Sequence, residues 1–128
     1  MRLKDCHNFE DFRKLAKKKL PSPIFHYIDG GSDDEVTLNR NTNSFNDYDL
    51  VPSVLNDVSN TDMSTTVLGE KIDFPLFPAA TAMHRLYHHE GERASAKAVE
   101  KKGTIFGTST MGTVSIEEIA KINKGPKL

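Results

Sequence analysis

The chain has 128 residues, a length that suits one domain of ordinary size. Its 17 Lys and Arg residues against 18 Asp and Glu residues give a net charge of −1, which argues against a general nucleic-acid binder. No apolar run approaches the roughly 18 residues of a membrane span, and the first residues lack the apolar core of a secretory signal. A single cysteine, Cys6, favours a reducing compartment. We therefore expect a soluble, intracellular protein.

Three helices are expected in the first fifty residues. The first covers residues 8–20, because apolar residues recur on one face, an asparagine can cap its start and a proline ends it. A second is expected over residues 23–29, ended by two glycines. The capping box Ser32-x-x-Glu35 opens a third, and poor helix formers predict fraying before Phe45. The lysines of the first helix, which a membrane surface or a partner would also suit, are interpreted as a solvated face (Lys14, Lys17, Lys18 and Lys19).

A small hairpin is expected in the middle of the chain. The run Val54–Val58 predicts a short extended stretch. Residues typical of strands then favour pairing of Thr65–Leu68 with Lys71–Asp73 across Gly69-Glu70. Because glycine stands first in this two-residue loop, the sequence predicts a type II′ turn.

The last third alternates strand and helix patterns. A buried strand is expected over Pro75–Ala80, a helix over His89–Lys102, a second strand over Thr104–Thr108 and a capped helix from Ser115 through Ile122. The first of these helices should direct three apolar residues inward and be capped by a glycine (Ala94, Ala98 and Val99; Gly103). This order predicts βαβ units with parallel pairing, hence an α/β protein. The chain ends where a third strand would begin, as in an incomplete fold.

The spacing of residues gives little support for a metal site or for a nucleotide-binding loop. His84 and His88 are spaced like metal ligands on a helix, but no H-E-x-x-H motif and no third suitably placed histidine accompany them. Neither G-x-G-x-x-G nor a Walker loop is present. We therefore expect no metal site and no classical nucleotide loop.

Small residues follow both predicted strands, as Ala79–Ala82 and Thr108–Thr110. In parallel α/β proteins, ligands bind at the carboxyl ends of the strands. Small side chains there let a flat ring approach the backbone, and hydroxyl groups can bond to the polar edge of the ring. Packing against the following helix explains the same residues equally well.

A series of short motifs follows in order along nearly the whole chain: Lys19-Leu20-Pro21, Tyr27 to Leu38, Asp57-Val58-Ser59, Asp62 to Thr66, Leu68-Gly69, Ala80 to Met83, Glu90-Gly91-Glu92, Gly103-Thr104, Ser109-Thr110 and Ser115 to Glu118. Each motif is weak by itself. Their order and spacing resemble the FMN-dependent α-hydroxy-acid dehydrogenases and oxidases, the family of glycolate oxidase and the flavin L-lactate dehydrogenases.

The resemblance implies a TIM (β/α)8 barrel of about 250 residues, preceded by N-terminal helices and a β-hairpin. Residues 1–128 would be the N-terminal portion of the enzyme domain, with the lead-in helices and hairpin in residues 1–74 and the first two βα units in residues 75–128. The barrel would be incomplete in this chain. The implied reaction oxidises an L-2-hydroxy acid, of the lactate or glycolate type, to the 2-oxo acid by hydride transfer to N5 of FMN.

Five residues match positions that bind substrate or cofactor in the family. Tyr27 matches the tyrosine whose hydroxyl bonds the substrate carboxylate, although a core tyrosine on the same face as Ile24 and Ile28 is the alternative from spacing. Three residues match the loop that lies against the flavin ring, largely through backbone groups, and a serine matches the hydroxyl that bonds the ring (Ala80, Thr81 and Ala82; Ser109).

The chain departs from the family pattern at two positions, and several functional residues of the family have no counterpart in it. Many members have proline where this chain has Ala80, and glycolate oxidases tend to have a bulky aromatic residue at Met111, so substrate size is left open. The catalytic histidine base, the carboxylate-binding arginine and the phosphate loops of the family would lie beyond Leu128. No catalytic residue is therefore assigned within the chain, and the 128-residue chain alone is expected to be inactive.

The resemblance further implies a small 2-hydroxy-acid substrate and, for the complete enzyme, a cytoplasmic homo-oligomer, with peripheral attachment to a membrane left open. Neither the particular acid nor the electron acceptor, oxygen or another, follows from it. Two alternatives stay open: a non-catalytic fragment or interaction module, and another FMN-dependent TIM-barrel enzyme such as an isomerase.

Overall fold

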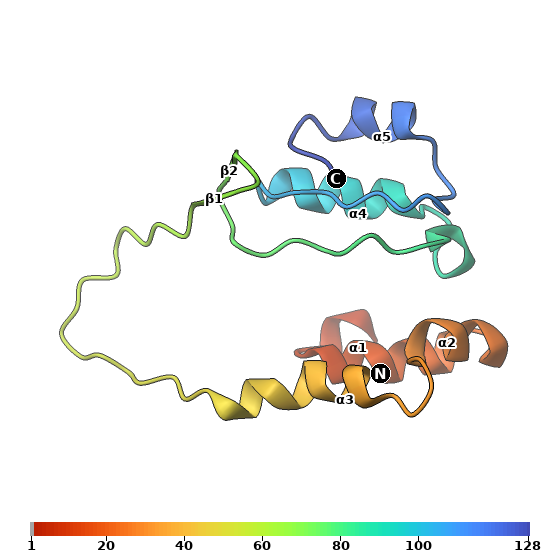
Figure 1. Cartoon of the computed structure of the whole chain (residues 1–128), viewed down its shortest axis with the longest axis horizontal. Helices are drawn as coiled ribbons and strands as arrows, with labels where there is room; N and C mark the ends of the chain where they lie inside the picture. The colour runs from red at the N-terminus through yellow and green to blue at the C-terminus, as the bar shows by residue number, and fades with distance from the viewer. Residues whose placement is uncertain (1) are drawn as a thin grey trace. The chain divides into compact units, whose positions relative to one another are not determined.

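A computed structural model describes residues 2–128. The chain divides into two compact units, one ending at Asn56 and the other beginning at Asp57. Helices α1, α2 and α3 belong to the first unit, and the hairpin β1–β2 with helices α4 and α5 belongs to the second (Figure 1). Around the division, residues 48–63 are exposed and contain no helix or strand.

The first unit contains three α-helices and two short 3₁₀ turns. Their bounds are Leu3–Asp5 (η1), Phe9–Lys19 (α1), Ser22–Asp29 (α2), Val36–Asn43 (α3) and Ser44–Asp47 (η2). The predicted cap of α1 is confirmed, because Asn8 Oδ1 accepts the Asp11 N–H at 2.9 Å. Helix α2 begins one residue before the predicted start. Leu15 of α1 and Phe25 of α2 are the buried apolar side chains of this unit, among the residues described.

The predicted start of the third helix is wrong. Helix α3 begins at Val36, and Ser32 does not cap it. The Glu35 carboxylate instead accepts the Gly31 N–H at 3.0 Å, and Glu35 itself has a φ of +57°, which interrupts helical geometry at this residue. The α-helix ends at Asn43, before Phe45 as predicted, and continues as η2.

The hairpin is confirmed, but its turn differs from the prediction. Strands β1 (Thr65–Val67) and β2 (Glu70–Ile72) pair antiparallel with Val67 opposite Glu70, so the loop is Leu68-Gly69. Both loop residues have positive φ, 53° and 84°, which defines a type I′ turn. The expected extended stretch at residues 54–58 forms no strand and has a bend at Leu55, where φ is +62°.

Helices α4 (Glu92–Lys101) and α5 (Ile116–Ile122) lie side by side in the second unit (Figure 1), and its core includes side chains from both. Its buried apolar side chains pack in one cluster (Ala96, Val99, Phe106, Val114 and Ile119). Val99 therefore points inward as predicted, whereas Ala94 is only half-buried and Ala98 is exposed. The inward face of α4 is formed by Glu92, Ala96 and Val99, and it therefore includes a carboxylate as well as apolar residues.

The residues predicted to cap these two helices are largely confirmed in that role. Gly103 follows α4 with a φ of +60°, as a capping glycine should. Ser115 caps α5, since its hydroxyl oxygen accepts the Glu118 N–H at 3.2 Å. Only half of the predicted capping box forms, because the Glu118 carboxylate pairs with Arg93 of α4 instead. This ion pair links the two helices.

The second predicted strand, residues 104–108, forms only a single parallel bridge, and that bridge is to the end of the chain rather than to the first predicted strand. Residues 104–106 are buried, and Phe106 forms a parallel bridge with Lys127. The Phe106 N–H donates to the Pro126 carbonyl at 3.0 Å, and the Leu128 N–H donates to the Phe106 carbonyl at 3.0 Å. The end of the chain therefore lies where the third strand was predicted.

The first predicted strand is not formed. Residues 75–80 are exposed and make no β-bridge, and Leu76 is 66% exposed. The Thr104 hydroxyl donates to the Leu76 carbonyl at 2.8 Å, so the segment still lies beside the second strand region. Pro75 and Pro78 have no N–H to donate to a ladder, which accounts for the missing backbone pairing. The described residues form no closed barrel.

Candidate functional site

The segments that follow the two strand regions meet within the second unit. The Met83 N–H donates to the Met111 carbonyl at 3.0 Å, which joins the two loops directly. A few residues earlier in each segment, a Cβ on Gly107 would lie 2.9 Å from the Ala80 nitrogen and 3.0 Å from the Pro78 carbonyl oxygen. Because Gly107 lacks a side chain, the two segments can approach this closely. The predicted clusters of small residues are thus brought to neighbouring positions.

A buried carboxylate fixes these loops to the start of α4. Glu92 is 2% exposed, and its Oε1 accepts the Thr113 N–H at 2.7 Å and the His84 N–H at 3.4 Å. Its Oε2 accepts the Thr113 hydroxyl at 2.6 Å. That hydroxyl oxygen in turn accepts the Arg85 N–H at 3.2 Å. Glu92 therefore holds both loops by charge-assisted hydrogen bonds, which are stronger than neutral ones.

Two opposing effects act on the ionisation of Glu92. Burial raises the pKa of its carboxyl, but the hydrogen bonds from the Thr113 hydroxyl and backbone outweigh burial and hold the pKa below its ordinary value. The carboxylate therefore stays ionised at neutral pH, the form that accepts all of these bonds.

The loop from Ala80 to Ala82 presents backbone rather than bulky side chains. Ala80 and Thr81 are exposed, Ala82 is half-buried, and the Thr81 hydroxyl donates to the Ala79 carbonyl at 3.3 Å. Among the residues described, no backbone hydrogen bond engages the N–H groups of these three residues. Backbone N–H groups beside small side chains are the kind of surface that a flat polar ring can approach.

Ser109 stands at the matching place after the second strand region. It is half-buried, and its Oγ accepts the Met111 N–H at 3.1 Å. Since Oγ acts as acceptor in this bond, its own hydrogen can be donated to a ligand. Loop and hydroxyl together fit one edge of a flavin, and no group for a flavin phosphate is assigned among them.

Tyr27 belongs to the first unit, on helix α2. Its side chain is 56% exposed, and the buried aromatic residue of this helix is Phe25. Within the first unit, this exposure does not agree with the spacing-based alternative of a core tyrosine.

The histidines form no metal-ligand set within residues 2–128. The His84 Nδ1 lies 3.3 Å from the Ser95 hydroxyl, and the rings of His88 and His89 lie 4.4 Å apart. Sequence reasoning did not identify Glu92 or Thr113 as parts of the site. No local signal links Glu92 to Thr113, because the two residues are 21 positions apart in the chain.

No helix among residues 2–128 has the length and apolar character that a membrane crossing needs.

The chain is similar to known proteins in sequence and in fold. Residues 16–128 match the model of the family described as FMN-dependent dehydrogenase. Glycolate oxidase of Spinacia oleracea is 42% identical over 118 residues, which are 92% of this chain and 32% of that protein. An L-lactate dehydrogenase of Vibrio parahaemolyticus is 44% identical over 116 residues, 91% of this chain and 31% of that protein.

Among solved structures, a soluble mutant of the membrane-associated (S)-mandelate dehydrogenase from Pseudomonas putida superposes with a TM-score of 0.82 at 35% identity. The match covers 94% of this chain and 34% of that one. The chain thus spans about a third of the length of its relatives, which are FMN-dependent TIM-barrel enzymes. With a family match over most of its residues, the chain belongs to the FMN-dependent dehydrogenase family.

Proposed function

We propose that this chain is the amino-terminal third of an enzyme that oxidises an L-2-hydroxy acid of the lactate or glycolate type to the 2-oxo acid. The observation that carries the proposal is the meeting of the Ala80–Ala82 loop with the Ser109 region, joined by the Met83–Met111 hydrogen bond and by Glu92. Membership of an FMN-dependent family and relatives named glycolate oxidase and L-lactate dehydrogenase support it.

In the proposed enzyme, residues of this chain hold one side of the cofactor and one end of the substrate. The N–H groups of Ala80, Thr81 and Ala82 and the hydroxyl of Ser109 bond the polar edge of the flavin. The hydroxyl of Tyr27 donates to the substrate carboxylate. Bound FMN supplies the hydride acceptor, its N5 atom.

The complete protein is proposed to be a TIM (β/α)8 barrel, in which residues 1–74 form the lead-in and residues 75–128 the first two βα units. The base, the carboxylate-binding arginine and the phosphate site would come from the remaining two-thirds. A homo-oligomer in the cytoplasm is proposed as its state and location.

The experiment is anaerobic flavin reduction by the purified complete enzyme. We expect bound FMN, and we expect its absorbance to bleach when L-lactate or glycolate is added without oxygen. The 128-residue chain alone should show no turnover of either acid. An enzyme without FMN, or turnover by the chain alone, would contradict the proposal. Bound FMN that neither acid bleaches would favour the isomerase alternative.

A further inference from the structure

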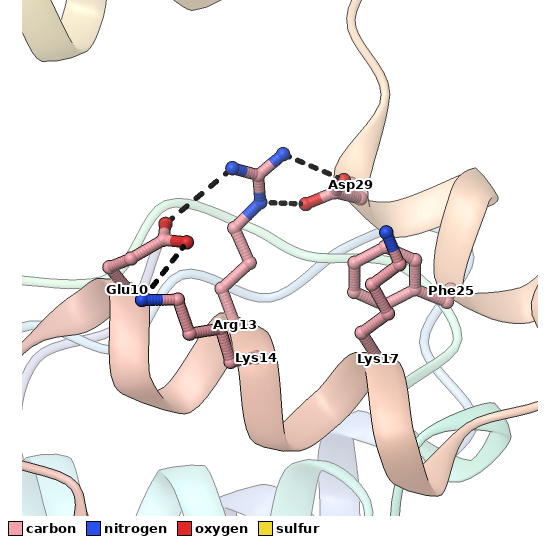
Figure 2. A pocket seen from close by; sticks show the side chains of 6 residues that line it. All are labelled: Glu10, Arg13, Lys14, Lys17, Phe25 and Asp29. Carbon is pink, nitrogen blue, oxygen red and sulfur yellow. Dashed lines mark hydrogen bonds and ion pairs between the residues drawn. The ribbon is translucent and has the colours of Figure 1, made fainter.

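Helices α1 and α2 are joined by a cluster of charged side chains. Arg13 binds Asp29 through two parallel bonds, Nε to Oδ1 at 2.5 Å and Nη2 to Oδ2 at 2.9 Å (Figure 2). Glu10 lies one turn before Arg13 on α1, with its carboxylate 3.5 Å from Arg13 Nη1. One turn after Arg13, the Lys17 ammonium lies 5.9 Å from the centre of the Phe25 ring. One face of α1 thus contacts both Phe25 and Asp29 of α2.

The bond between Arg13 and Asp29 acts across the helices rather than within one. Asp29 is the last residue of α2, where a negative charge is unfavourable because the carboxyl end of a helix is itself negative. The paired guanidinium compensates this charge and holds the pKa of the Asp29 carboxyl below its ordinary value. The planar fork of arginine also fixes direction, which a lysine would not do.

Two anchors on α2 determine how this helix is rotated about its axis. Phe25 and Asp29 are four residues apart and share one face, which is the face toward α1. Tyr27 lies midway between them, about 200° around the axis from Phe25, and therefore projects from the opposite side. Its 56% exposure agrees with that direction. Loss of either anchor would leave the direction of the Tyr27 side chain less fixed.

We propose that Arg13 is a positioning residue for Tyr27: its bidentate bond to Asp29 sets the rotation of α2 and thereby the direction of the tyrosine hydroxyl. The inference rests on the proposed function, in which that hydroxyl binds the substrate carboxylate. It adds a residue that touches neither substrate nor cofactor, and it extends the site to helix α1.

The test is a double-mutant cycle in the complete FMN-loaded enzyme, measured as kcat/KM for the acid that bleaches the flavin. Tyr27→Phe removes a hydrogen bond to a charged group and should lower kcat/KM about 10- to 150-fold. Arg13→Ala should lower it at least about threefold, since small misplacements of binding groups cost rate. In the Tyr27→Phe background, Arg13→Ala should lower kcat/KM by a further factor of less than about 1.5, because the effects of two residues that act through one contact are not additive.

Two further variants complete the design. Asp29→Asn keeps the size of the anchor and weakens only the charged pair, so it tests the link even where Arg13→Ala impairs folding. Lys14→Ala is the matched control, because Lys14 pairs with Glu10 at 3.9 Å within α1 and should leave kcat/KM unchanged. FMN content is measured for every variant.

The outcomes separate the inference from the function on which it rests. If Tyr27→Phe leaves kcat/KM unchanged, the substrate-binding role of Tyr27 fails and the positioning role falls with it. If Tyr27→Phe has its effect but Arg13→Ala and Asp29→Asn do not, the positioning role alone is overturned. Equal losses from Arg13→Ala in both backgrounds also overturn it, since they indicate a general structural effect.

Discussion

The second unit buries seven apolar side chains among the described residues, whereas the first unit buries two, Leu15 and Phe25. In the second unit, a buried apolar cluster packs on α4 and α5, and the buried Glu92 carboxylate binds the loops that follow the two strand regions. In the first unit, the Asn8 cap and the Arg13–Asp29 ion pair help to place α1 and α2, the helix that carries Tyr27. The proposed cofactor surface thus adjoins a packed core, whereas the residue proposed to bind substrate is placed by polar links.

The largest expected effect is loss of the Phe106 side chain. Phe106 is 2% exposed and lies in the cluster between α4 and α5. Phe106→Ala should lower the free energy of unfolding of the complete enzyme by about 3–5 kcal/mol, measured by denaturant titration. Phe45→Ala, which removes the same ring from an exposed position, is the control and should change it by about 0.5 kcal/mol or less. Similar losses in both variants would break the comparison between the units.

A smaller effect is expected from Glu92→Gln. This change removes the charge of a carboxylate that accepts three hydrogen bonds, each with a donor–acceptor distance of 3.4 Å or less. The free energy of unfolding should therefore fall by about 1.5–3 kcal/mol at neutral pH. Because the folded pKa of Glu92 lies below the unfolded value of about 4.3, this stabilisation is present above that pH.

The lowered pKa of Glu92 determines the sign of the pH dependence. As the pH falls through the folded pKa of Glu92, the wild-type carboxyl takes up a proton and its contribution is lost. The difference in unfolding free energy between wild type and Glu92→Gln should therefore shrink in acid. A difference that stays constant from neutral to acid pH would show that the ionised carboxylate is not what stabilises the loops.

Features that depend on a few neighbouring residues, such as helix caps, could be predicted from the sequence. Features that depend on residues far away in the chain, such as strand pairing, could not. The caps at Asn8 and Ser115 and the glycine after α4 are read from a few neighbouring residues, and all three are confirmed. The box at Ser32 failed because the Glu35 carboxylate binds the Gly31 N–H instead. The strand predicted at residues 75–80 does not form, because Pro75 and Pro78 offer no N–H to a ladder and no neighbouring strand pairs with the segment within the described residues.

The candidate site shows the same limit. Ala80–Ala82 and Ser109 could be proposed because small residues and hydroxyls after strands form a recognisable pattern, and the resemblance gave them roles. Glu92 reads as an ordinary first-turn glutamate of a helix. Its burial depends on Thr113 and His84, whose amides reach it only in the folded chain.

The affinity of the complete enzyme for FMN after Ser109→Ala tests the central assignment most directly. Ser109→Ala removes one neutral hydrogen bond to the flavin, worth about 0.5–1.5 kcal/mol, so the Kd for FMN should rise about 2- to 12-fold. Ser95→Ala removes a hydroxyl that contacts His84 rather than the proposed flavin edge, and it should leave the Kd unchanged. A selective rise in the Ser109→Ala variant supports the assignment. Equal FMN affinity in wild type and Ser109→Ala would contradict it.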